Sequence, residues 1–187
     1  KCFTVTMLVY TTAFVLNILG IFVIRQDLML KAYIPSVMIY LASWIVSRMM
    51  SPSNKIKKYI ILSGSIYVFT ITGVFITYHA ILVTLLPFLY AALYSSKRVM
   101  TFVYIMTTIS TVIIVYGGYY FGLCDANMAL LTTGSVSDYL VNGVFTLTEV
   151  NPNPLVSLFL FFVLPRCLIY VAFMAVCNSI FRIVSGS

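Results

Sequence analysis

Charged side chains are scarce in this chain of 187 residues. Only 8% of its residues are charged, whereas about 25% is usual in a soluble domain. Hydrophobic residues make up 62% of the sequence. Because so few charges cannot cover a water-exposed surface, a water-soluble globule is excluded. About 20 apolar residues cross a bilayer once, so the chain has room for at most about six or seven crossings.

Residues that bind metals or perform acid–base chemistry are also few. The sequence contains four acidic residues, four cysteines and one histidine, His79, and their spacing matches no recognised metal site. Cys124 is the only cysteine expected on the same side of the membrane as His79, and no neighbouring residue would activate its thiol. We therefore expect no catalytic residues, no metal and no cofactor. The eleven Lys and Arg residues are spread between apolar runs, so they form no basic face for nucleic acid.

The apolar runs predict an all-α integral membrane protein with a bundle of six transmembrane helices. We expect crossings at about residues 3–24, 32–46, two within 59–94, 99–121 and 155–184. A turn at Thr77–His79 would separate the third and fourth crossings, and Pro35 would lie in the first turn of the second. We assign residues 1–184 to one membrane domain and residues 185–187 to a boundary or linker remnant of a longer protein.

The distribution of charge predicts that both termini are cytoplasmic. In this orientation all four acidic residues are outside and eight of the eleven cations are inside. These eight are Lys1, Arg48, Lys55, Lys57, Lys58, Lys97, Arg98 and Arg182. The connection at residues 122–154 is then outside, and the apolar composition of residues 136–147 allows a short interfacial helix.

Arg166 is the one cation predicted near the centre of the bilayer, where a charge is costly and often functional. Pro165 cannot donate to the carbonyl of Phe161, so the helix should be locally open there. Under one hypothesis Arg166 satisfies freed carbonyls and hydroxyls, or reaches the inner surface, and so stabilises helix packing. Under the other it binds an anionic head group of a ligand or lipid.

Polar and aromatic residues at several depths are further candidates. Pro87 should break the fourth crossing, and Thr107, Ser110 and Thr111 share one face of the fifth, which is typical of hydrogen bonds between helices. His79 could respond to external pH, although a lone histidine is more often structural. For the aromatic residues, ordinary packing is the alternative to lining a pocket. Our candidate ligand-binding residues are Arg166, Tyr170, Tyr90, Trp44, His79 and Tyr67.

Two segments are TLLPFLYAALYSSKRVMTFVYIMTTIS (Thr84–Ser110) and FVLPRCLIYVAFMAVCNSIFRI (Phe162–Ile183). Both resemble parts of the six-helix membrane sensor regions of bacterial signalling proteins, especially diguanylate cyclases. The second resembles the last span of those regions, which leads into a cytoplasmic effector. The glycine-rich signature of the cyclase is absent from this sequence, so the effector would lie outside it.

The resemblance implies a ligand-sensing domain, without enzymatic activity of its own, in the bacterial cytoplasmic membrane. Its partners would be membrane lipids and a small apolar or amphiphilic ligand, anionic if Arg166 binds it. A homodimer would form through the effector and the end of the last helix, where Ile180, Ile183 and Val184 are apolar. The alternative is the substrate-binding subunit of an energy-coupling vitamin importer, but the first helix lacks the Ala-x-x-x-Ala spacing of that family.

Overall fold

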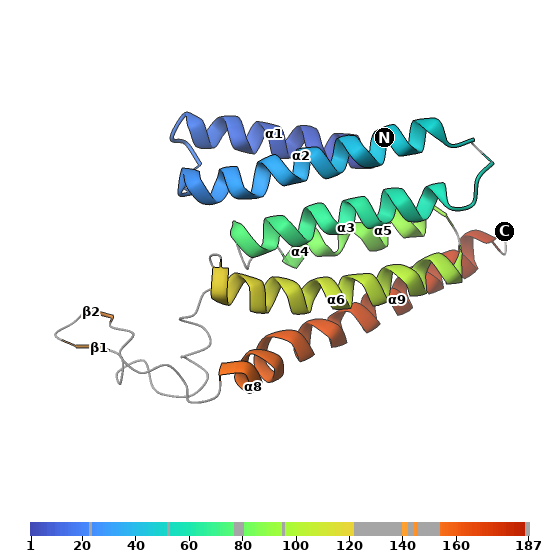
Figure 1. Ribbon diagram of the computed structural model, residues 1–187. Helices are drawn as coiled ribbons and strands as arrows, with labels where there is room; N and C mark the ends of the chain where they lie inside the picture. The colour runs from blue at the N-terminus through green and yellow to red at the C-terminus, as the bar shows by residue number, and fades with distance from the viewer. Residues whose placement is uncertain are drawn as a thin grey trace.

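Six helical segments lie side by side in the computed structural model (Figure 1), which describes residues 1–22, 24–51, 53–76, 81–94, 96–121, 140–141, 144–145 and 154–185. The all-α prediction is confirmed for these ranges, apart from one short strand pair. The first three segments are α1 (Cys2–Ile18), α2 (Gln26–Met49) and α3 (Lys57–Phe75). The fourth consists of α4 (Ile81–Thr84) and α5 (Leu86–Ala92), and the fifth is α6 (Lys97–Phe121). The sixth runs through α8 (Pro154–Leu158), the π-helix η3 (Phe159–Val163) and α9 (Leu164–Ser185).

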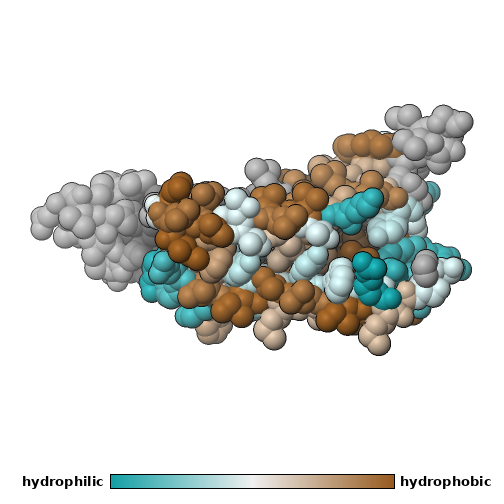
Figure 2. Space-filling view, turned by 90° about the horizontal axis from the view of Figure 1, so that it is seen from above, coloured by the Kyte–Doolittle hydropathy of each residue, from teal (hydrophilic) through white to brown (hydrophobic). Residues whose placement is uncertain are grey.

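Within the described residues, α2, α3 and α6 are long and apolar enough to cross a membrane, which indicates a multi-pass membrane protein. Hydrophobic side chains cover most of the middle of the face that α1 and α2 form, and hydrophilic ones gather toward its ends (Figure 2). Both termini lie at the same end of the bundle (Figure 1). We call this the basic end, because Lys1, Arg48, Lys57 and Lys97 are placed there by the helix bounds.

The connection between α1 and α2 lies about six residues earlier in the chain than we expected from the sequence, at residues 19–25. Helix α1 ends at Ile18, not near residue 24, because Asn17 donates its side-chain amide to the carbonyls of Phe22 and Ile24 and so stabilises a turn. Gly20 in that turn has φ +73°, a conformation that glycine adopts without strain. Helix α2 already begins at Gln26, with an acidic residue in its first turn, where the helix dipole favours negative charge.

The position of Pro35 was therefore predicted wrongly, since it lies inside α2 and not in the first turn. A proline there leaves the carbonyl of Lys31 without its usual helical donor. The next residue, Ser36, is buried and donates its hydroxyl to the carbonyl of Ala32 at 2.7 Å. The helix thus continues through the proline with a side-chain hydrogen bond on its buried face.

The helix irregularities predicted at Pro87 and Pro165 are both confirmed. The fourth segment is interrupted at Leu85, immediately before the turn that contains Pro87. Ahead of Pro165, η3 forms a wider turn in which the N–H of Leu164 bonds to the carbonyl of Phe159. Each proline thus coincides with an irregular turn that adjusts the backbone hydrogen bonds.

The predicted outer connections are described only in part. Strands β1 (Leu140–Val141) and β2 (Val144–Phe145) pair antiparallel, with Leu140 opposite Phe145. The predicted interfacial helix over residues 136–147 is therefore wrong at these four residues, because they pair as two short strands and do not form a helix. The turn predicted at Thr77–His79 lies outside the described residues.

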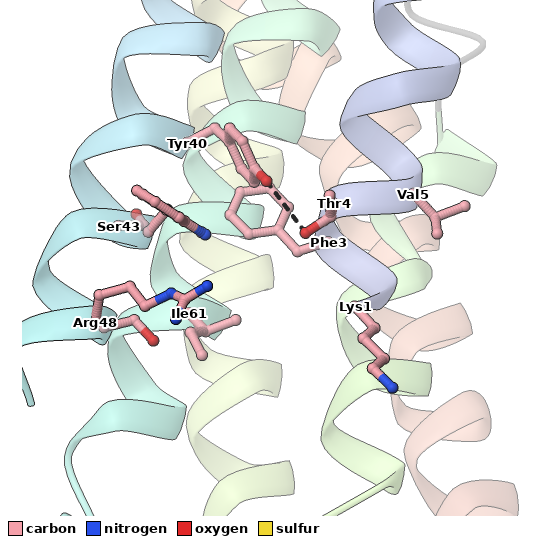
Figure 3. Close-up of a pocket in the computed structure, with 10 residues that line it drawn as sticks. Lys1, Phe3, Thr4, Val5, Tyr40, Ser43, Arg48 and Ile61 are labelled. Carbon is pink, nitrogen blue, oxygen red and sulfur yellow. Dashed lines mark hydrogen bonds between the residues drawn. The ribbon is translucent and has the colours of Figure 1, made fainter. Parts of the chain in front are cut away.

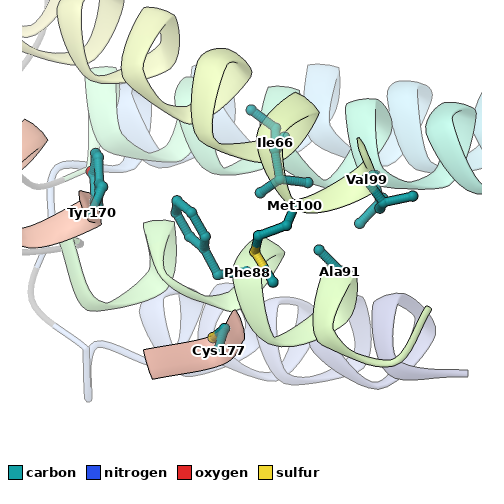
Figure 4. Packing of buried hydrophobic residues seen from close by; sticks show 9 residues of the cluster. Ile66, Phe88, Ala91, Val99, Met100, Tyr170 and Cys177 are labelled. Atoms are coloured by element: carbon teal, nitrogen blue, oxygen red, sulfur yellow. The ribbon is translucent and has the colours of Figure 1, made fainter. Parts of the chain in front are cut away.

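The core joins α3, α5, α6 and α9. Its buried members include Leu62, Ile66, Phe88, Met100 and Tyr170 (Figure 4). On the other side of α3, Gly64 packs directly against Ser43 of α2. Small residues at such a contact allow two helix backbones to approach closely in a membrane.

We predict that Gly64→Ala destabilises the protein by about 1–3 kcal/mol, the usual cost of overpacking. The new Cβ would clash with the Oγ of Ser43 and lie 3.0 Å from its Cβ, so the Ser43 side chain must rotate and the two helices must separate slightly. Thermal unfolding in detergent measures the effect. Ser63→Ala, on the same helix, is the control, and an unchanged melting temperature for Gly64→Ala would contradict the close contact.

Candidate functional site

A buried hydroxyl cluster joins α4, α6 and α9. The side chain of Tyr170 is fully buried, and its Oη lies 2.9 Å from Thr84 Oγ1 and 2.8 Å from Thr111 Oγ1. Thr111 donates its own proton to the carbonyl of Thr107 at 3.0 Å, so Tyr170 is the donor toward Thr111. The face of α6 that carries Thr107, Ser110 and Thr111 is buried, and Ser110 and Thr111 hydrogen-bond to other helices, as the sequence predicted.

Arg166 lies one helical turn before Tyr170 on the same buried face of α9. Only 6% of its surface is exposed, and its guanidinium carbon lies 6.0 Å from the centre of the Phe162 ring. A cation over an aromatic face gains electrostatic stabilisation where water is absent. Arg166 is thus buried next to the helix irregularity at η3, and its role in binding an anion stays a prediction.

The other candidate residues do not converge on this pair. Tyr90 of α5 packs at the edge of the core cluster, but its hydroxyl bonds to Thr6 of α1. Trp44 of α2 and Tyr67 of α3 are 47% and 49% exposed and border different pockets. His79 lies outside the described residues. The structure therefore brings Arg166 and Tyr170 together and leaves the other described candidates apart from them.

An apolar cavity of about 370 Å³ lies between α1, α2, α3 and the broken fourth segment. We call it the apolar cavity. Neither Arg166 nor Tyr170 lines it. Its walls are mostly hydrophobic, and include Val9, Ala13, Met29, Val68, Val83 and Leu86. Only three of its lining residues carry polar side-chain groups, the hydroxyls of Thr6, Tyr10 and Thr72.

Tyr10 is the polar group that distinguishes this cavity. Its hydroxyl oxygen is buried and lies near the hydroxyls of Thr72 and Ser36, but it makes no hydrogen bond of good geometry within the described residues. Thr72 and Ser36 each donate their protons to backbone carbonyls, at 2.8 and 2.7 Å. A buried hydroxyl without a well-placed partner is costly, so a ligand atom that bonds to it would gain free energy.

Sequence analysis missed this cavity, although α1 carries a signal for it. Thr6, Tyr10 and Ala13 stand at positions i, i+4 and i+7, so one face of the helix combines two hydroxyls with a small residue. The opposing wall comes from distant segments, and only the fold brings it there. Among the described residues, no group of three His, Cys, Asp or Glu side chains could hold a metal ion.

Comparisons with family models, with curated proteins and with solved structures found no match for this chain.

We predict that Tyr170→Phe lowers stability by about 1 kcal/mol, within the range measured for hydrogen bonds between membrane helices. The variant keeps the ring but loses the bonds to Thr84 and Thr111. Thermal unfolding in lipid nanodiscs measures this. Tyr67→Phe removes a hydroxyl from a half-exposed ring and should melt like the wild type. Equal melting temperatures for the two variants would show that the cluster contributes nothing to stability.

Proposed function

We propose that this chain is the ligand-binding membrane domain of a bacterial signalling receptor, and that the apolar cavity is its ligand site. The observation that supports the proposal is an apolar cavity of about 370 Å³ whose lining includes Tyr10, a residue whose buried hydroxyl has no hydrogen-bond partner within the described residues. Small-molecule sites are usually apolar cavities of about 300–1,000 Å³ with a few polar groups that orient the ligand. The ligand is then a small, mainly apolar molecule with one polar atom for Tyr10.

The contacts of the cavity wall support a route for a signal to the last helix. Val83 and Leu86 line the cavity on either side of the break in the fourth segment. Next to them, Thr84 hydrogen-bonds to Tyr170, and the Phe88 ring lies 5.7 Å from the Tyr170 ring. A ligand that displaces this segment therefore acts directly on α9. Helix α9 ends at the basic end, which we place in the cytoplasm, beside the effector.

We predict that 2-naphthol, a rigid apolar probe with one hydroxyl, binds saturably to the protein in lipid nanodiscs. Ala13→Phe fills the cavity and should weaken binding about tenfold or more, which corresponds to about 1.4 kcal/mol. Ala172→Phe adds the same ring on an exposed face of α9 and should bind like the wild type. Probe fluorescence, corrected with empty nanodiscs, measures both. Equal binding by the two folded variants would exclude the apolar cavity as the site.

Signalling is tested by joining α9 to the catalytic domain of a diguanylate cyclase. We expect 2-naphthol to change cyclic di-GMP synthesis by the chimera and to have no effect on the Ala13→Phe chimera, because its cavity is already filled. Saturable binding without any change in synthesis would leave the ligand site in place but contradict the receptor role. Uptake of the bound molecule by cells would then favour a transport subunit.

A further inference from the structure

A second pocket, of about 530 Å³, lies at the basic end between the first turn of α1 and the last turns of α2 (Figure 3). We call it the basic pocket and define it by Lys1, Thr4, Tyr40, Trp44 and Arg48, which all line it. The O–H of Tyr40 donates to Thr4 Oγ1 at 3.1 Å and so links the two helices beside the pocket. None of these residues lines the apolar cavity, so the two sites are separate.

The basic pocket carries positive charge that no lining carboxylate balances. Lys1 immediately precedes α1 and Arg48 lies in the last turn of α2, and no acidic residue is among the residues that line the pocket. In the described part of the chain the single carboxylate is Asp27, which pairs with Arg25 at 2.9 Å near the start of α2, at the opposite end of that helix. A concave surface lined by one sign of charge attracts a ligand of the other sign.

Trp44 helps to hold the arginine at the pocket. The guanidinium carbon of Arg48 lies 5.2 Å from the centre of the Trp44 ring, a cation–π contact. The N–H groups of a guanidinium donate in its plane, the arrangement that a bidentate contact with an anion requires. Ser43 and Ser47 add hydroxyl donors on the same helix.

The remaining walls are apolar. Phe3, Val5 and Ile61 line the pocket next to the charged groups. A tryptophan that is 47% exposed near a helix end, close to cations, is typical of the interface between membrane and water. A free anion would use only the polar part of this pocket, whereas an anion attached to an acyl chain would use both parts.

We propose that the basic pocket binds the phosphate group of an anionic phospholipid in the cytoplasmic leaflet. Arg48 contacts two phosphate oxygens, Lys1 adds a point charge, and the acyl chain packs on the apolar wall. The proposal rests on the cytoplasmic placement of the basic end. It does not depend on the apolar cavity or on a receptor role.

Trp44 is the only tryptophan of the chain, so its fluorescence reports on this pocket alone. The protein is placed in nanodiscs whose scaffold protein lacks tryptophan. The lipid is phosphatidylcholine with increasing phosphatidylglycerol whose acyl chains carry bromine, a quencher of tryptophan. Fluorescence is divided by that in unbrominated lipid of the same composition, which removes any direct effect of a variant on Trp44. We expect Trp44 to be quenched more strongly than randomly mixed lipid would quench it. Such an excess would show that phosphatidylglycerol is preferred at the pocket.

Arg48→Gln should reduce this preference about fivefold, the effect of one cation near an anionic lipid surface. Lys1→Gln tests the second cation in the same way and serves if Arg48→Gln does not fold. Arg48→Lys keeps the charge without the bidentate geometry and should retain part of the preference. Lys55→Gln removes an exposed charge between α2 and α3 that does not line the pocket, and should change nothing.

Three outcomes would overturn the proposal. The first is no preference for phosphatidylglycerol in the wild-type protein. The second is an equal loss in Lys55→Gln and Arg48→Gln, which would show a general surface attraction and no site. The third is displacement of the quenching lipid by inorganic phosphate, which would show that a free anion occupies the pocket. Binding of 2-naphthol is measured in the unbrominated samples of the same composition, so failure of either proposal is seen independently of the other.

Discussion

Hydrogen bonds between hydroxyl side chains connect the helices of this protein. Inside a bilayer the lipid is as apolar as the side chains, so apolar burial alone gives helices little reason to associate in one arrangement. Here paired hydroxyls supply specific contacts between segments. Thr11 pairs with Tyr33 between α1 and α2 at 3.0 Å, Thr70 with Ser110 between α3 and α6 at 2.6 Å, and Thr111 with Tyr170 between α6 and α9. These pairs set which helix faces meet, and hence where cavities remain.

The number of helices and the breaks in them could be predicted because they depend on local sequence. Apolar runs separated by charges define the segments, and Pro87 and Pro165 act on the turns that contain them. The start of α2 was missed because Arg25, Asp27 and Lys31 suggested a connection. In the structure Arg25 and Asp27 pair and Asp27 lies in the first helical turn, so charges at a membrane surface are compatible with helix. Pro35 was then assigned to the wrong turn.

The candidate sites depend on tertiary packing, and sequence reasoning located them poorly. Arg166 attracted attention because a central charge is costly, and its burial beside Phe162 shows one way in which that cost is reduced. The two cavities instead involve α1, whose only signal for either of them is the face that carries Thr6, Tyr10 and Ala13. Their walls join positions far apart in the chain, such as Tyr10 with Val83 and Lys1 with Arg48. The spacing of residues within one helix cannot predict which residues of distant helices lie together.

Helix α1 borders both sites, and this position has a physical consequence. Its first turn lines the basic pocket and its middle lines the apolar cavity, and Thr6, one of the residues that line the cavity, bonds to Tyr90 of α5. A lipid that draws Lys1 toward Arg48 and a ligand that bonds to Tyr10 therefore act on one rigid element. If a ligand bound at one site shifts α1 and so changes the affinity of the other site, then binding at that other site must change the affinity of the first by the same factor. The composition of the inner leaflet would then set the ligand concentration to which the domain responds.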